Sequence, residues 1–220
     1  MENLRKTSNE GGSKETSRLE AFSDGVFAIA ITLLTLELIE MLKPQTEKGF
    51  LNLLFNHWAS LAAFGIGFLT ILVCWINHHL VFTYIRKTDG RLMWVNGLVL
   101  LVVTFTPFPT AILAEYFDKE PSTALAFYGF NYFMMSVAAY SVCAYPYNKH
   151  LIEEHSRDLF SRFKLLYKYS IVYTFLVFFV CLISVAAAIF FYCILFFVFA
   201  FPKAAARRIP QMQSRKKHRN

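Results

Sequence analysis

Five long apolar blocks constrain this chain more than any other feature of its 220 residues. They cover residues 19–40, 57–84, 92–116, 122–147 and 169–201. A helix rises about 1.5 Å per residue and the hydrocarbon core of a bilayer is about 30 Å thick, so roughly 20 apolar residues cross it once. Each of the first four blocks is long enough for one such helix. With 56% hydrophobic and 17% charged residues, the chain is predicted to be an all-α, polytopic membrane protein.

The fifth block is too long for one crossing, because its 33 residues would make a helix of roughly 50 Å. The distribution of Lys and Arg favours a hairpin of two short helices with a turn near residues 184–187. With that hairpin, 19 of the 22 basic residues lie on one side of the membrane and 3 on the other. Basic residues concentrate on the cytoplasmic side, so we predict six transmembrane helices with both termini in the cytoplasm.

The blocks divide the chain into three parts. Residues 1–17 are polar, show no cleavable signal peptide and are expected to form a disordered tail. Residues 18–203 are expected to form the six-helix transmembrane domain, and residues 204–220 a basic cytoplasmic tail. This last tail either binds anionic lipid headgroups or acts only as a cytoplasmic anchor. Nucleic acid is not expected as a partner, because no folded domain or aromatic stacking platform accompanies the tail.

Polar residues from three predicted helices fall at similar depths in the inner half of the membrane. Counted from the nearest basic residues, Asp24 lies about 9 Å deep, His78 and His79 about 11–12 Å, and Asn96 about 7–8 Å. Buried polar groups in lipid need partners. We therefore expect a network that joins Asp24 and Ser23 to His78 or His79 and Asn96. It serves either as a clamp between helices or as a proton relay or cation site.

The first helix has two different faces. At 100° per residue, Ile29, Leu33 and Leu36 form one apolar stripe, and Glu40 lies on the same face near its outer end. Asp24 falls on the back of the helix, toward the predicted neighbours. Periodicity alone leaves open whether the stripe faces lipid, the core or a pore.

One motif is more specific. Arg18, followed after three residues by Phe22-Ser23-Asp24, resembles the R-x-x-x-F-S-D signature of the transmembrane-protein-175 potassium channels. Trp75, with His78 and His79, resembles the second helix of that family. The resemblance implies a homotetramer of six-helix subunits, in which four copies of the first helix line a pore for monovalent cations. A single repeat is typical of the prokaryotic form, located in the plasma membrane.

The resemblance also implies roles for individual residues. Ile29 would form the narrowest ring, Leu33 and Leu36 further rings, and Thr32 would lie near the constriction. Such an apolar neck favours potassium, which gives up water more cheaply than sodium. With Asn96 added from its depth, the residues expected to support the pore helix are Arg18, Phe22, Ser23, Asp24, Trp75, His78, His79 and Asn96. At the outer mouth, Glu37 and Glu40 are expected to attract cations.

The sequence alone is also compatible with other functions. A proton leak of the same architecture would use Asp24 and the histidines as titrating groups. A small secondary transporter is less favoured, because such proteins usually show internal repeats. No nucleophile or metal constellation is visible, and the four cysteines lie inside apolar blocks without a CxxC pattern. We therefore expect no metal, no cofactor besides the permeant potassium, and no enzymatic activity.

Overall fold

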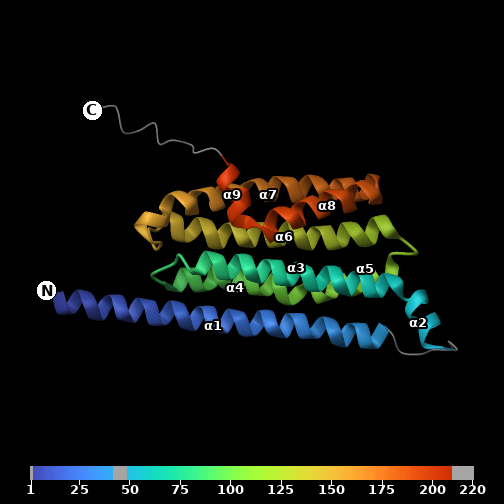
Figure 1. Ribbon diagram of the computed structural model, residues 1–220, viewed down its shortest axis with the longest axis horizontal. Coiled ribbons are helices and arrows are strands. Elements are labelled where there is room, and N and C mark those ends of the chain that lie inside the picture. Colours follow the sequence, from blue (N-terminus) through green and yellow to red (C-terminus); the bar gives the residue numbers. More distant parts are fainter. Residues whose placement is uncertain (1, 42–48, 210–220) are drawn as a thin grey trace.

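Helices account for nearly all of the structure, a computed structural model that describes residues 2–41 and 49–209. Six rods lie side by side along the long axis: α1, α3, α4 continued by α5, α6, α7 and α8 (Figure 1). The helices are α1 (Glu2–Met41), α2 (Phe50–Asn56), α3 (Trp58–Phe82), α4 (Gly90–Phe105), α5 (Pro107–Tyr116), α6 (Pro121–Asn148), the 3-10 helix Glu154–Ser156, α7 (Arg157–Ile183), α8 (Val185–Ala200) and α9 (Pro202–Arg208).

Four stretches are long and apolar enough to cross a membrane, namely Glu15–Glu40, Trp58–Phe82, Gly90–Tyr116 and Glu154–Ile183. The bent pair α8 and α9 would make a fifth. Helix α6 lies beside them but carries tyrosine, serine and asparagine among its apolar residues. The all-α, multi-pass membrane class is confirmed, while six crossings and cytoplasmic termini stay predictions.

The fifth apolar block is a hairpin, as predicted. Helix α7 ends at Ile183 and α8 begins at Val185, so the break lies at Ser184. The backbone there is extended, with φ −152° and ψ 111°, and the Ser184 hydroxyl accepts a hydrogen bond from the backbone N–H of Ala187 at 3.4 Å. A serine cap therefore makes the turn without glycine or proline.

At the N-terminus the structure differs from the expected tail. Helix α1 begins at Glu2 and continues without a break into the first apolar block. Residues 1–17 contain no proline that would stop such a helix. A hydrogen bond of 2.7 Å between the hydroxyls of Thr16 and Thr88 joins α1 to the loop between α3 and α4.

The α3–α4 loop is tied to other parts of the bundle. Asp89 caps α4 by accepting a hydrogen bond from the Leu92 N–H at 2.8 Å, and it accepts another from the Tyr145 hydroxyl of α6 at 2.6 Å. Arg86 of the same loop forms an ion pair with Glu153. These contacts fix the ends of α3, α4 and α6 relative to one another, which positions the polar residues nearby.

Candidate functional site

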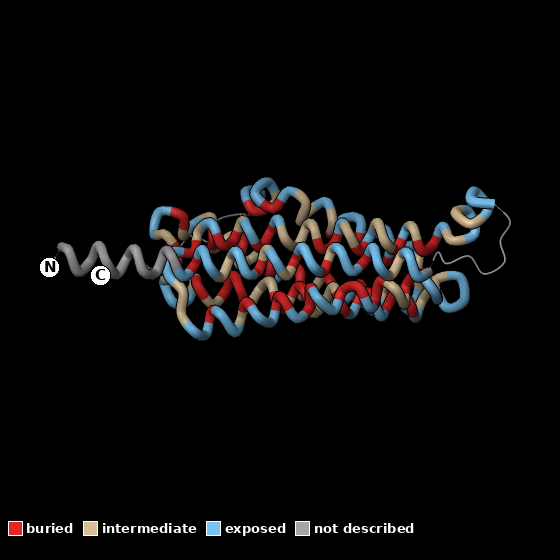
Figure 2. The backbone as a smooth tube through the Cα atoms, turned by 90° about the horizontal axis from the view of Figure 1, so that it is seen from below, coloured by how far each residue is buried: buried red, intermediate tan, exposed pale blue. Residues whose placement is uncertain are grey.

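Helix α1 lies at the edge of the bundle (Figure 1) and has one buried and one exposed face. Phe27, Ala30 and Leu34 are almost fully buried against the other helices. The predicted stripe is on the opposite side: Ile29 is 58% exposed, Leu33 39% and Leu36 62%. Figure 2, seen from the side of α1, shows exposed positions recurring along this helix. A single subunit therefore leaves the stripe uncovered.

A buried chain of hydrogen bonds joins α1, α4 and α3. His78 Nε2 lies 2.7 Å from the Asn96 carbonyl oxygen, and the Asn96 amide donates to the Ser23 hydroxyl at 2.9 Å. The Ser23 hydroxyl in turn donates to the Leu19 carbonyl at 2.8 Å. Since the Asn96 oxygen can only accept, His78 donates from Nε2. We call Ser23, Asn96 and His78 the serine network.

Aromatic rings enclose the histidine of this network. The His78 ring stacks on Phe82, with centroids 4.4 Å apart, and lies 5.3 Å from the Phe27 ring. Within the described residues its Nδ1 has no hydrogen-bond partner. An imidazole with one donating nitrogen and two aromatic neighbours is suited to packing, which favours a clamp over proton relay at this residue.

Asp24 and His79 make contacts of their own, separate from the serine network. Trp75 Nε1 donates to an Asp24 carboxylate oxygen at 2.8 Å. His79 stacks on Trp75, with centroids 5.9 Å apart, and its Nδ1 lies 2.8 Å from a Glu20 carboxylate oxygen. Sequence reasoning did not identify Glu20, although it lies one helical turn before Asp24. The sequence predicted a single network. The structure has three separate contacts between α1 and its neighbours instead: the serine network, the Asp24–Trp75 hydrogen bond and the Glu20–His79 pair.

The remaining predicted residues divide between the two faces of α1. Arg18 and Phe22 are exposed on the single subunit, and their supporting roles stay predictions. Thr32 is exposed and its hydroxyl donates to the Ile29 carbonyl at 2.8 Å. Glu40 is exposed as well, whereas Glu37 is half-buried, and one of its carboxylate oxygens is enclosed with no hydrogen-bond partner among the described residues. Glu37 therefore lies beside the bundle, away from the stripe.

The outer half of α1 packs closely at a glycine that sequence reasoning missed. A Cβ atom on Gly67 of α3 would lie 2.9 Å from Thr110 Cγ2 of α5 and 3.2 Å from Leu34 Cδ2 of α1. Both distances are shorter than ordinary van der Waals contact. Glycine at this position therefore lets α1, α3 and α5 approach one another, as small residues do in membrane bundles.

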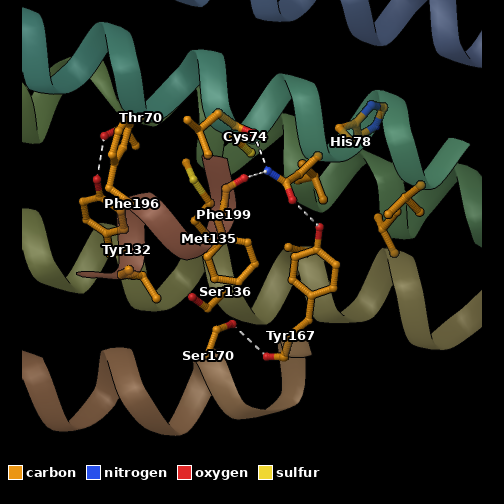
Figure 3. Close-up of a pocket in the computed structure, with 17 residues that line it drawn as sticks. Thr70, Cys74, His78, Tyr132, Met135, Ser136, Tyr167, Ser170, Phe196 and Phe199 are labelled. Carbon is orange, nitrogen blue, oxygen red and sulfur yellow. Dashed lines mark hydrogen bonds between the residues drawn. The ribbon is translucent and has the colours of Figure 1, made fainter. Parts of the chain in front are cut away.

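A second buried polar group lies between α3, α7 and α8, next to a cavity of about 80 Å³. The Asn77 amide donates to the carbonyls of Val73 at 2.7 Å and Phe199 at 2.8 Å, and its oxygen accepts from the Tyr167 hydroxyl at 3.0 Å. Figure 3 shows Tyr167, Phe199 and Met135 around this cavity. Its walls are mainly apolar and none of them comes from α1.

No three His, Cys, Asp or Glu residues within 2–41 and 49–209 are grouped so that they could hold a metal ion. Helix α1 instead offers a polar back face that is held by its neighbours and an apolar front face that is exposed. Such a helix is suited to contact other copies of the chain or to line a passage between them.

Residues 18–107 match the family model described as "Endosomal/lysosomal potassium channel TMEM175". A protein of Chamaesiphon minutus named as a potassium channel is 52% identical over 103 residues, which are 46% of this chain and 51% of that protein. A protein of Streptomyces collinus, also named as a potassium channel, is 45% identical over 124 residues, 56% of this chain and 60% of that protein. These matches span about half to three fifths of the relatives' length.

The fold has a counterpart among solved structures. The crystal structure of a lysosomal potassium-selective channel TMEM175 homolog from Chamaesiphon minutus superposes with a TM-score of 0.74 and 34% sequence identity. The match covers 86% of this chain and 98% of that chain. The similarity therefore extends beyond the signature in α1 to the whole bundle.

Proposed function

The chain belongs to the TMEM175 family, and on this premise we propose that it is a potassium-permeable cation channel that prefers potassium to sodium. In this proposal four copies assemble in the membrane with six crossings each, and both termini lie in the cytoplasm. One α1 from each copy lines a central pore, and permeant potassium is its ligand.

The exposed stripe of α1 carries this proposal. Ile29, Leu33 and Leu36 are apolar and uncovered on one subunit, on the side opposite to the buried Phe27 and Leu34. Four such stripes around an axis would form a narrow apolar neck, which gates by losing and regaining water. An ion that passes it gives up part of its hydration shell, and this cost is lower for potassium than for sodium.

The contacts behind α1 act in this proposal as a clamp. The serine network, the Asp24–Trp75 hydrogen bond and the Glu20–His79 pair all hold the inner part of α1 against α3 and α4. None of these groups lies on the stripe, so the proposal assigns them orientation of the helix and not contact with the ion.

Ile29→Asn tests the neck directly. The full chain is reconstituted into planar bilayers, and the reversal potential is measured with potassium on one side and sodium on the other. The polar, flexible side chain should wet and widen the neck, so the reversal potential should move toward zero. Ile39→Asn is the matched control, because Ile39 is 58% exposed on the same helix but ten residues farther along and off the stripe. Unchanged selectivity in Ile29→Asn would exclude the stripe as the filter.

A proton pathway is the second candidate, because Glu20 and Asp24 of α1 and His79 of α3 place three titratable side chains where these two helices meet. It predicts a reversal potential that follows a pH gradient at equal potassium on both sides. The potassium channel predicts the opposite: the potential follows the potassium gradient and ignores the pH gradient.

A further inference from the structure

The last described helix, α9, leaves the bundle at a right angle. Only Phe201 separates it from α8, and the two helices are bent by 95° relative to each other. Since α8 lies along the bundle axis, α9 runs across it (Figure 1). A helix perpendicular to membrane-spanning helices lies parallel to the membrane surface. At the bend, the Phe201 side chain is 66% exposed and can reach the acyl region, as apolar anchors of interfacial helices do.

Helix α9 is held in place on one side and exposes basic residues on the other. Pro202 and Ala206 are buried, whereas Lys203, Arg207 and Arg208 are exposed. The Arg162 guanidinium of α7 donates to the carbonyls of Arg207 and Ile209, both at 3.3 Å. This contact fixes the C-terminal end of α9, so its exposed side faces away from the bundle.

The positive charge of this region has no counter-charge in the nearby sequence. Asp158 is the last acidic residue of the chain, and the 62 residues that follow it contain ten Lys and Arg. In the described part of the chain, no acidic side chain pairs with Lys203, Arg207 or Arg208. The field of these groups therefore attracts anions from outside the protein.

The depth of α9 matches the headgroup layer. Charged residues occur in α7 up to Lys168, and residues 169–183 have none. Arg162, which binds the end of α9, lies six residues before Lys168, or about 9 Å along the helix. Tyr169 follows that boundary and is 55% exposed, as is typical of aromatic residues at a membrane interface. Helix α9 therefore contacts α7 just outside the hydrocarbon core.

We propose that Lys203, Arg207 and Arg208 of α9 form a binding site for the headgroups of anionic phospholipids. The basic residues contact the headgroup phosphate while Phe201 lies among the acyl chains. Arginine suits this role because its planar guanidinium can bind a phosphate with two parallel hydrogen bonds. The distribution of Lys and Arg assigns this end of the bundle to the cytoplasmic leaflet. The site is independent of ion selectivity, because it lies on α9 and not on α1.

Native mass spectrometry of the detergent-purified full chain tests the site. Retained lipid is measured after titration with phosphatidylglycerol and with phosphatidylcholine of the same acyl chains. Wild type should retain phosphatidylglycerol preferentially. Each basic residue near an anionic surface contributes about fivefold in affinity, so Lys203→Gln/Arg207→Gln/Arg208→Gln should weaken phosphatidylglycerol binding by about 100-fold. The matched control is Lys87→Gln/Arg91→Gln/Lys149→Gln, which removes three exposed charges from two interhelical connections and the first turn of α4, at the same end of the bundle.

Further variants separate this site from loss of folding. Arg207→Gln and Arg208→Gln alone should each weaken binding by about fivefold, and Arg207→Lys/Arg208→Lys should keep the lipid preference. Equal losses in the α9 and control triple variants would overturn the site, and so would unchanged binding in an α9 variant that elutes like wild type. Excess glycerol phosphate should leave the lipid bound; its full displacement would show a site for soluble anions and refute the lipid assignment.

Discussion

Asn96→Leu is the sharpest perturbation of the clamp, because Asn96 is the middle member of the serine network. Its amide group donates to Ser23 at 2.9 Å and its oxygen accepts from His78 at 2.7 Å, with the side chain only 1% exposed. Leucine has a similar size but makes neither bond. The Ser23 hydroxyl keeps its bond to the Leu19 carbonyl, whereas His78 Nε2 loses its acceptor.

The size of the effect follows from these two losses. Hydrogen bonds between membrane helices contribute about 0.6 kcal/mol on average and up to about 1.7, so the two bonds together contribute about 1–3 kcal/mol. A buried donor left without an acceptor costs about 1–3 kcal/mol more. Leucine gains back part of this by placing a more apolar side chain in the core. We expect the free energy of unfolding to fall by about 2–4 kcal/mol.

Reversible unfolding of the full chain in mixed micelles, followed by circular dichroism, measures this difference. Thr104→Val is the matched control on the same helix, since the exposed Thr104 hydroxyl donates to the carbonyls of Leu100 and Leu101 in its own turn and bonds to no other helix within the described residues. It should change stability by less than about 0.5 kcal/mol. Equal stability of Asn96→Leu and Thr104→Val would refute the view that the network holds α1, α3 and α4 together.

Three further outcomes follow from the same contacts. Asp24→Ala removes the acceptor of the Trp75 hydrogen bond, so it should lower the yield of assembled protein or the open probability while leaving the permeability ratio unchanged; a changed ratio in normally assembled protein would contradict the clamp. Gly67→Val should lower the melting temperature, because even a Cβ at this position would approach Thr110 to 2.9 Å, whereas Gly65→Val meets no such neighbour and serves as the control. Partial burial alone would raise the pKa of Asp89, but the hydrogen bonds that its carboxylate accepts from the Tyr145 hydroxyl and backbone N–H groups lower that pKa below 3.8. Its stabilising contribution should therefore be present above about pH 4 and be lost as the pH falls through the lowered pKa; Asp89→Asn should remove this part of an acid-unfolding curve, and an identical acid limb in the variant would contradict it.

The sequence was sufficient to predict which polar residues share a layer, because depth depends only on counting residues from a basic boundary. It could not say which of two adjacent histidines meets Asn96. Neighbouring residues on a helix point 100° apart, so the answer depends on the rotation of α3 about its own axis. In the structure His78 points to Asn96 and His79 to Glu20.

The close packing between helices could not be predicted from the sequence either. The hairpin in the fifth block could be predicted from the length of the block and from the distribution of basic residues. The role of Gly67 could not, because it depends on the distances between α1, α3 and α5, which residues far apart in the chain determine. Glu37 shows the same limit. Its place at an outer mouth stays a prediction, but the sequence did not indicate that it lies between the stripe and the buried face with one carboxylate oxygen enclosed.

The rotation of α1 explains why a pore helix would carry polar residues on its back. Ile29 stands between Ala28 and Ala30, so a turn of 100° in either direction would replace a large side chain by a methyl group at the proposed neck. Apolar contacts alone resist such a turn weakly in lipid, because lipid tails are as apolar as the core. The hydrogen bonds that Ser23 accepts from Asn96 of α4 and Asp24 accepts from Trp75 of α3 do resist it, since each is lost when the helix turns. In the proposed tetramer, the hydrogen bonds of Ser23 and Asp24 would thus keep Ile29, and not an alanine, facing the pore axis.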